Sequence, residues 1–104
     1  MGDIIRPRKL VKSLREDLIF LVCRLMCVVE DLITLIDDKS RDKFSILKNQ
    51  YTQLLICIHD KLNELIKLDI YYSGQWKEIS INFENTLEID IDFLGSIIEQ
   101  IFNL

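Results

Sequence analysis

The stretch LIFLVCRLMCVV, residues 18–29, decides the fold, because it contains a single charged side chain, Arg24, and is otherwise apolar. Around it, apolar residues recur at alternating steps of three and four, which is the spacing of one face of a helix. The first series is Val11, Leu14, Leu18, Leu21, Leu25, Val28, Leu32 and Leu35. A second series is Ile19, Val22, Met26, Val29, Ile33 and Ile36, and a third face carries Phe20, Cys23 and Cys27. The sequence therefore predicts one long helix that is apolar on several sides.

A helix of this kind needs neighbours on more than one side. One apolar stripe is enough for a surface helix of a bundle. Two complete stripes need more cover, and a chain of 104 residues has few other helices to supply it. We therefore predict that this helix is both the central helix of the domain and an interface in a homo-oligomer, most simply a dimer. The predicted interface residues are Leu18, Leu21, Val22, Leu25, Met26, Val29 and Leu32.

A second long helix follows a polar connector. The connector is DDKSRDK, residues 37–43, and either Ser40 or Asp42 can cap the helix after it. The short connector makes the second helix antiparallel to the first, and we expect it to run to about Tyr72. Its apolar residues, again at steps of three and four, are Phe44, Leu47, Tyr51, Leu54, Ile58, Leu62 and Leu65.

The tail of the chain fits two interpretations. The segments EISINF and LEIDIDF alternate apolar and polar residues, which is typical of a β-hairpin over residues 77–91. The apolar residues from Trp76 to Ile101 are also spaced by threes and fours, and Asn85 followed by Glu88 resembles a capping box. An isolated hairpin is only marginally stable, which favours helices.

We therefore predict an all-α fold, a small antiparallel helical bundle. Two long helices are followed by two C-terminal helices near residues 75–84 and 86–103, with the β-hairpin as the alternative. The whole chain, residues 1–104, forms a single domain, and residues 1–9 form a basic N-terminal arm.

Residues 65–93 resemble one tetratricopeptide repeat. The residues that carry the likeness are Tyr71, Tyr72, Gly74, Trp76, Phe83 and the segment TLEID at residues 86–90. The chain departs from the family pattern at Lys67 and Ile79, where small residues are usual, and at Ile91, where proline is usual. The resemblance implies a helical hairpin here, and in that family stacked hairpins form a groove that binds peptides.

Charge is unevenly distributed along the chain, whose net charge is −4. Residues 78–104 contain six acidic residues and no basic one. The basic residues near the amino end are predicted to form a charged surface for a partner, although without interleaved aromatic residues they give nucleic acid only weak support. These basic residues are Arg6, Arg8, Lys9, Lys12 and Arg15.

The cysteine count and the charges within the apolar stretch bear on location. Three cysteines, an odd number, favour free thiols and a reducing compartment, so we expect a cytoplasmic protein, or one of the host cytoplasm if it is viral. Arg24, Glu30 and Asp31 argue against a membrane span, because charges are costly in lipid.

Few residues suggest chemistry. Cys23, Cys57 and His59 invite a zinc site, but Cys57 and His59 point to nearly opposite sides of one helix, so we expect neither a metal nor a cofactor. The segment HDKLNEL, residues 59–65, resembles the H-D-x-x-N-x-L box around the phosphorylated histidine of sensor kinases, which makes His59 a candidate phosphoacceptor. We otherwise expect His59 to be a half-buried structural residue. No nucleophile motif or phosphate-binding glycine loop is present, so an enzyme is not expected.

The expected function is therefore binding. We predict a non-enzymatic helical module for protein–protein interaction and oligomerisation. Its Ile-rich, Ala-free composition suits a small phage or viral protein that acts as an inhibitor or adaptor on a host macromolecular complex. The alternatives are a histidine-phosphotransfer hairpin that uses His59 and a small nucleic-acid-binding regulator that uses the basic arm.

Overall fold

The chain folds into four helices. The computed structural model describes the backbone of residues 2–35 and 41–104, and the side chains from residue 8 onward within these ranges. The helices are α1 (Gly2–Leu35), α2 (Arg41–Leu68), α3 (Ser73–Asn85) and α4 (Ile91–Phe102). No strand occurs in the described ranges, so the prediction of a small all-α bundle is confirmed, and the alternative β-hairpin is wrong.

Two sequence predictions touch residues outside this description. The side chain of Arg6 and the proposed cap at Ser40 lie among the residues that are not described. The backbone of the expected N-terminal arm is helical from Gly2 and continuous with the rest of α1.

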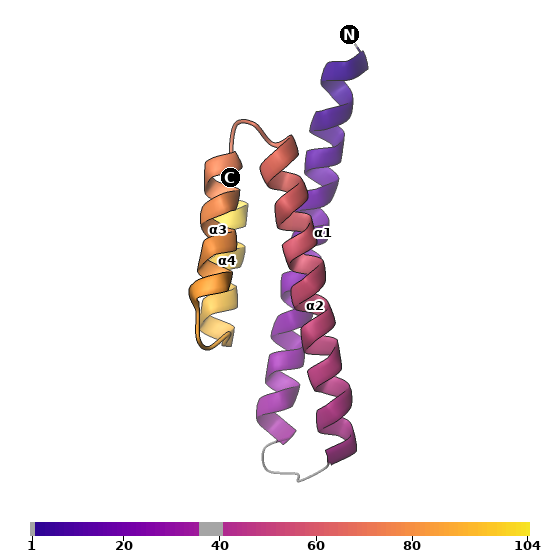
Figure 1. The fold of residues 1–104 in the computed structure, drawn as a ribbon, viewed down its shortest axis with the longest axis vertical. Helices are drawn as coiled ribbons and strands as arrows, with labels where there is room; N and C mark the ends of the chain where they lie inside the picture. The colour runs from indigo at the N-terminus through magenta and orange to yellow at the C-terminus, as the bar shows by residue number, and fades with distance from the viewer. Residues whose placement is uncertain (1, 36–40) are drawn as a thin grey trace.

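The two long helices form an antiparallel hairpin, and the two short helices lie along one side of it. Helix α3 packs on α2, and α4 packs on α1. At 1.5 Å per residue, α1 is about 50 Å long and α3 only about 20 Å. Helices α3 and α4 therefore cover only part of the hairpin, and its connector end extends past them, as Figure 1 shows.

The core lies where all four helices meet. The long helices α1 and α2 contribute apolar residues from the series spaced by threes and fours. The short helices contribute the others, among them the fully buried Trp76 of α3 and Leu94 of α4. Three aromatic rings join the layers: His59 packs edge-on against Phe83 at 6.3 Å, and Phe83 against Phe93 at 5.2 Å. The buried core residues are Leu14, Leu18, Val22, Leu25, Val29, Ile58, Leu62, Leu65, Trp76, Ile79, Phe83, Leu94, Ile97 and Ile101.

The last helix begins later than the sequence analysis predicts. Asn85 is the final residue of α3, and Thr86 leaves the helix with extended backbone (φ −79°, ψ 132°). Helix α4 starts at Ile91, where the carboxylate of Asp90 accepts a hydrogen bond of 2.7 Å from the backbone N–H of Phe93. The predicted cap at Asn85 was wrong because Asp90 is an equally good N-cap residue and adds a negative charge at the helix N-terminus.

Helix α2 ends at Leu68 rather than near Tyr72, and a tight turn leads into α3. The turn is held by Asp69, whose side chain is buried although it is charged. Its Oδ2 accepts a hydrogen bond of 2.8 Å from Nε1 of Trp76. The turn is therefore tied directly to the centre of the core.

Candidate interaction surface

The predicted interface residues of α1 lie mainly inside the chain's own core. Leu18, Val22 and Leu25 are fully buried, and Val29 is nearly so. The other three, Leu21, Met26 and Leu32, are half-buried. Because α2 and α4 of the same chain already cover these side chains, they leave little surface for a second chain.

Apolar side chains are exposed where the hairpin extends beyond α3 and α4. Ile33 of α1 is 54% exposed and Phe44 of α2 is 47% exposed. Ile33 lies on the same apolar stripe as Val22 and Val29, which come earlier in α1 and are buried. The stripe is therefore uncovered at this end because no helix of the described chain lies against it.

Ile33 and Phe44 come from different helices but lie at the same level of the hairpin. An ion pair of 3.8 Å between Asp17 Oδ2 and Lys61 Nζ shows the approximate register of α1 against α2. The same antiparallel register places Ile33 level with Ser45, one residue from Phe44. We call Ile33 and Phe44 the connector-end surface.

The connector-end surface continues into the core. Tyr51 lies two turns along α2 from Phe44 and is half-buried against the core cluster. Burial raises the pKa of the Tyr51 hydroxyl above its ordinary value of 10.0.

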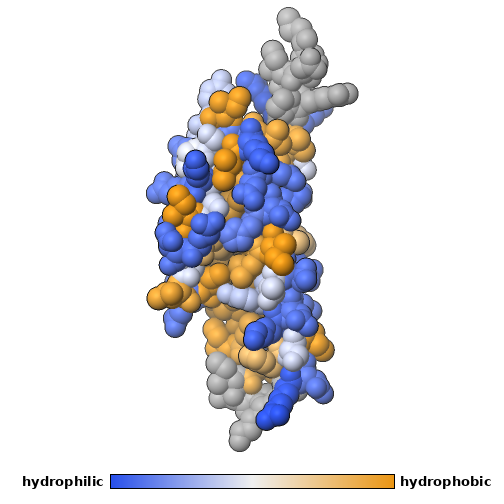
Figure 2. Space-filling model, in the orientation of Figure 1, coloured by the Kyte–Doolittle hydropathy of each residue, from blue (hydrophilic) through white to orange (hydrophobic). Residues whose placement is uncertain are grey.

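The connector end also has an apolar groove between α1 and α2. Its volume is about 360 Å³, Leu35, Ile46 and Leu47 line it, and Asp31 and Lys43 stand among its polar residues. Ile46 is 58% exposed. In Figure 2 a group of apolar side chains lies toward this end of the molecule, and others are scattered over the same face.

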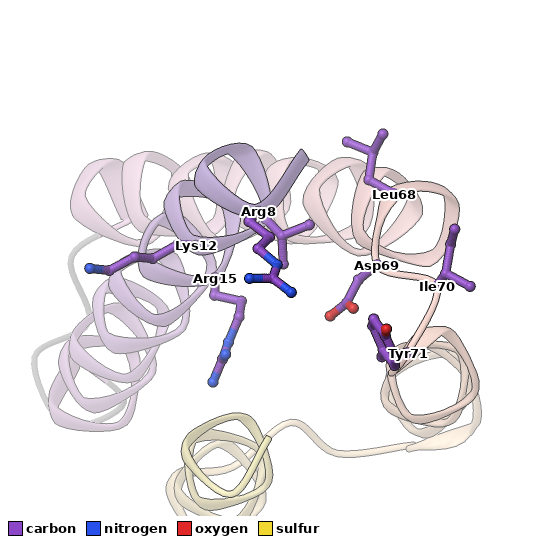
Figure 3. A pocket seen from close by; sticks show the side chains of 8 residues that line it. Arg8, Lys12, Arg15, Leu68, Asp69, Ile70 and Tyr71 are labelled. Carbon is purple, nitrogen blue, oxygen red and sulfur yellow. The ribbon is translucent and has the colours of Figure 1, made fainter. Parts of the chain in front are cut away.

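A second hollow lies at the opposite end of the hairpin. It has a volume of about 360 Å³ and brings Arg8, Lys12 and Arg15 of α1 against the turn that follows α2. These are three of the five predicted basic surface residues; Lys9 is exposed outside the hollow. We call this hollow the basic pocket, and Figure 3 shows it from close by.

The candidate chemical residues are dispersed. His59 is half-buried with its ring against Phe83, as the structural interpretation expects. The three cysteines, Cys23, Cys27 and Cys57, are free and exposed. Within the described part of the chain, no three His, Cys, Asp or Glu side chains are grouped so as to hold a metal ion.

Comparison with known proteins adds no relative. No protein-family model matches the chain, and neither a curated protein nor a solved structure matches it. Among the described residues, no helix has the combination of length and apolar character needed to cross a membrane.

Proposed function

We propose that the chain is a non-enzymatic interaction module that associates with a second copy of itself through the connector end of its hairpin. The observation that carries the proposal is the exposure of Ile33 and Phe44, which lie near the end of α1 and the start of α2. In the covered part, four helices surround one core. In the uncovered part, only the two helices α1 and α2 are present.

A second hairpin in the antiparallel direction supplies the two missing helices. Each chain then covers the other's exposed stripe, and the four helices of the two ends complete a bundle like the one inside each chain. The contact is two-fold symmetric, so each interface residue occurs in it once from each chain. The assembly therefore closes as a dimer. This geometry is available because the uncovered lengths of the two hairpins are equal.

The other two functions have less support from the geometry. A phosphoacceptor needs an accessible imidazole, whereas His59 is half-buried against Phe83. A nucleic-acid surface needs cations that reach a phosphate backbone in a row. Arg8 and Arg15 instead share a hollow with the carboxylate of Asp69.

Sedimentation analysis of single variants tests the dimer. The wild-type chain is expected to pass from monomer to dimer between about 1 µM and about 1 mM, a range that corresponds to roughly 8 to 4 kcal/mol of binding free energy. Ile33→Glu and Phe44→Glu are each expected to weaken the dimer at least about tenfold, because each places a charge in a desolvated contact. Both positions are half-exposed in the single chain, so the variants should still fold.

Phe102→Glu is the matched control. Phe102 is 67% exposed, more than either test residue, but it is the last residue of α4, away from the connector end. This variant is expected to leave the dimer unchanged. The proposal is wrong if the wild type remains monomeric over the whole range, or if Phe102→Glu weakens association as much as Ile33→Glu does.

A further inference from the structure

The basic pocket places opposite charges on facing walls. One wall is α1, with Arg8 and Arg15, and the other is the turn after α2, with Asp69. In Figure 3 the guanidinium of Arg8 and the carboxylate of Asp69 point toward one another across the pocket. Among the described residues no ion pair joins Arg8 to Asp69, although both line the pocket.

Asp69 is held in place as a hydrogen-bond acceptor. Asp69 is only 8% exposed. Its Oδ2 accepts the hydrogen bond from Nε1 of Trp76, a residue that is fully buried. Among the described residues, Oδ1 accepts no hydrogen bond, and Asp69 is one of the residues that line the pocket. A fixed carboxylate oxygen of this kind suits an N–H donor.

The α1 wall supplies donors for an anion. The guanidinium of Arg8 faces Asp69 across the pocket, while Lys12 points away from it in Figure 3. Arg15 donates from one guanidinium nitrogen to the backbone oxygen of Ile101, at 3.2 Å, so its side chain extends toward α4. Guanidinium groups match the geometry of a carboxylate better than an ammonium does.

The pocket also has an apolar lining. Val11 of α1 contributes to it, and so do Leu68 and Ile70, whose side chains point away from Arg8 in Figure 3. A cavity of about 150 Å³ already accommodates benzene. The basic pocket, at about 360 Å³, is therefore large enough for an apolar side chain together with the polar groups that flank it.

We propose that the basic pocket binds an apolar α-amino-acid group. Its carboxylate is held by Arg8, its nitrogen donates to Oδ1 of Asp69, and its side chain lies against Val11. The same chemistry is presented by a free apolar amino acid and by the C-terminal residue of a peptide. The pocket is at the opposite end of the hairpin from the connector-end surface, so this inference does not depend on dimer formation.

The indole N–H of Trp76 provides a direct readout. Trp76 is the only tryptophan, and its Nε1–H is bonded to the carboxylate that the ligand would contact. Its ¹⁵N–¹H resonance should shift and saturate on titration with L-leucine to about 20 mM, a concentration that reveals millimolar affinity. L-leucinamide, which lacks the carboxylate, and 4-methylpentanoate, which lacks the nitrogen, should each bind at least about tenfold more weakly, since a hydrogen bond to a charged group contributes that much.

N-acetyl-L-leucine distinguishes the two sources of the ligand. It keeps the carboxylate and one N–H, as a peptide C-terminus does. Binding of N-acetyl-leucine as tight as that of leucine assigns the pocket to peptide C-termini, whereas binding of leucine alone assigns it to the free amino acid. The proposal is overturned if neither compound shifts the Trp76 resonance, or if leucinamide binds as tightly as leucine.

Two variants of equal charge complete the test. Arg8→Gln and Lys9→Gln each remove one positive charge, and both residues are exposed, but only Arg8 lines the pocket. Arg8→Gln should weaken leucine binding about tenfold, and Lys9→Gln should leave it within about twofold. An equal loss in both variants would show a general electrostatic effect and would also overturn the proposal.

Discussion

Replacement of Asp69 by alanine should destabilise the chain more than any other change to a charged side chain discussed above. The substitution removes the acceptor of the Trp76 Nε1 hydrogen bond, which is 2.8 Å long and buried. Trp76 is fully buried, and among the described residues its Nε1–H has no acceptor other than Asp69. A hydrogen bond to a charged group contributes about 1.5–3 kcal/mol, and an unpaired buried donor costs a similar amount, so we expect a loss of about 2–3 kcal/mol in the free energy of unfolding.

A loss of that size is measurable in a domain of 104 residues. Such domains have about 5–15 kcal/mol of stability, and each kcal/mol corresponds to about 4–8 °C in Tm. Urea unfolding can be followed by the fluorescence of Trp76, the only tryptophan. Asp69→Asn keeps a neutral acceptor and should cost about 1 kcal/mol, and Asp60→Ala, at an exposed position, should change stability by less than about 0.5 kcal/mol.

The order of the three variants is the test. The reasoning requires Asp69→Ala to be the most destabilising, Asp69→Asn to be intermediate and Asp60→Ala to be close to wild type. If Asp69→Ala unfolds at the same urea concentration as Asp60→Ala, the Trp76 hydrogen bond does not stabilise the turn. The account of the α2–α3 connection would then be refuted.

Three further outcomes follow from packing, capping and titration. Leu25→Ala should lower the free energy of unfolding by about 2–5 kcal/mol in urea denaturation, whereas Leu87→Ala should be near neutral because Leu87 is fully exposed. Asp90→Ala should cost about 1 kcal/mol by the same assay, and Asp92→Ala, which removes no cap, should cost less. In an ultraviolet titration, Tyr51→Phe should remove the tyrosine that ionises late. Because burial raises the pKa of Tyr51, its stabilising contribution is present below pH 10.0 and is lost as pH rises through the folded-state pKa.

The helices and the core of the hairpin could be predicted from the sequence, because they depend on local spacing. Steps of three and four identify the buried side of α1 without knowledge of its neighbours. Leu14, Leu18 and Leu25 are buried as that spacing requires, and so are Ile58 and Leu62 of α2.

The identity of the covering chain could not be predicted in the same way. Spacing shows which side of a helix is apolar, but it does not show whether the neighbour belongs to the same chain or to another. Leu18 and Ile33 therefore look alike in sequence, although Leu18 is fully buried and Ile33 is 54% exposed. The basic pocket was also only partly visible, because Asp69 is brought to Arg8 by the fold and not by sequence proximity.

The length of the last helix depends on a single cap. The sequence offers Asn85 and Asp90 as competing starts for the last helix, and local propensity ranks them almost equally. A start at residue 86 would lengthen α4 by five residues, or about 7 Å, toward the connector end. The start at Ile91 leaves residues 86–90 as a non-helical connection, in which Ile89 is partly buried against the core. The choice of cap at one end of a short helix thus determines how far the last helix extends along the hairpin.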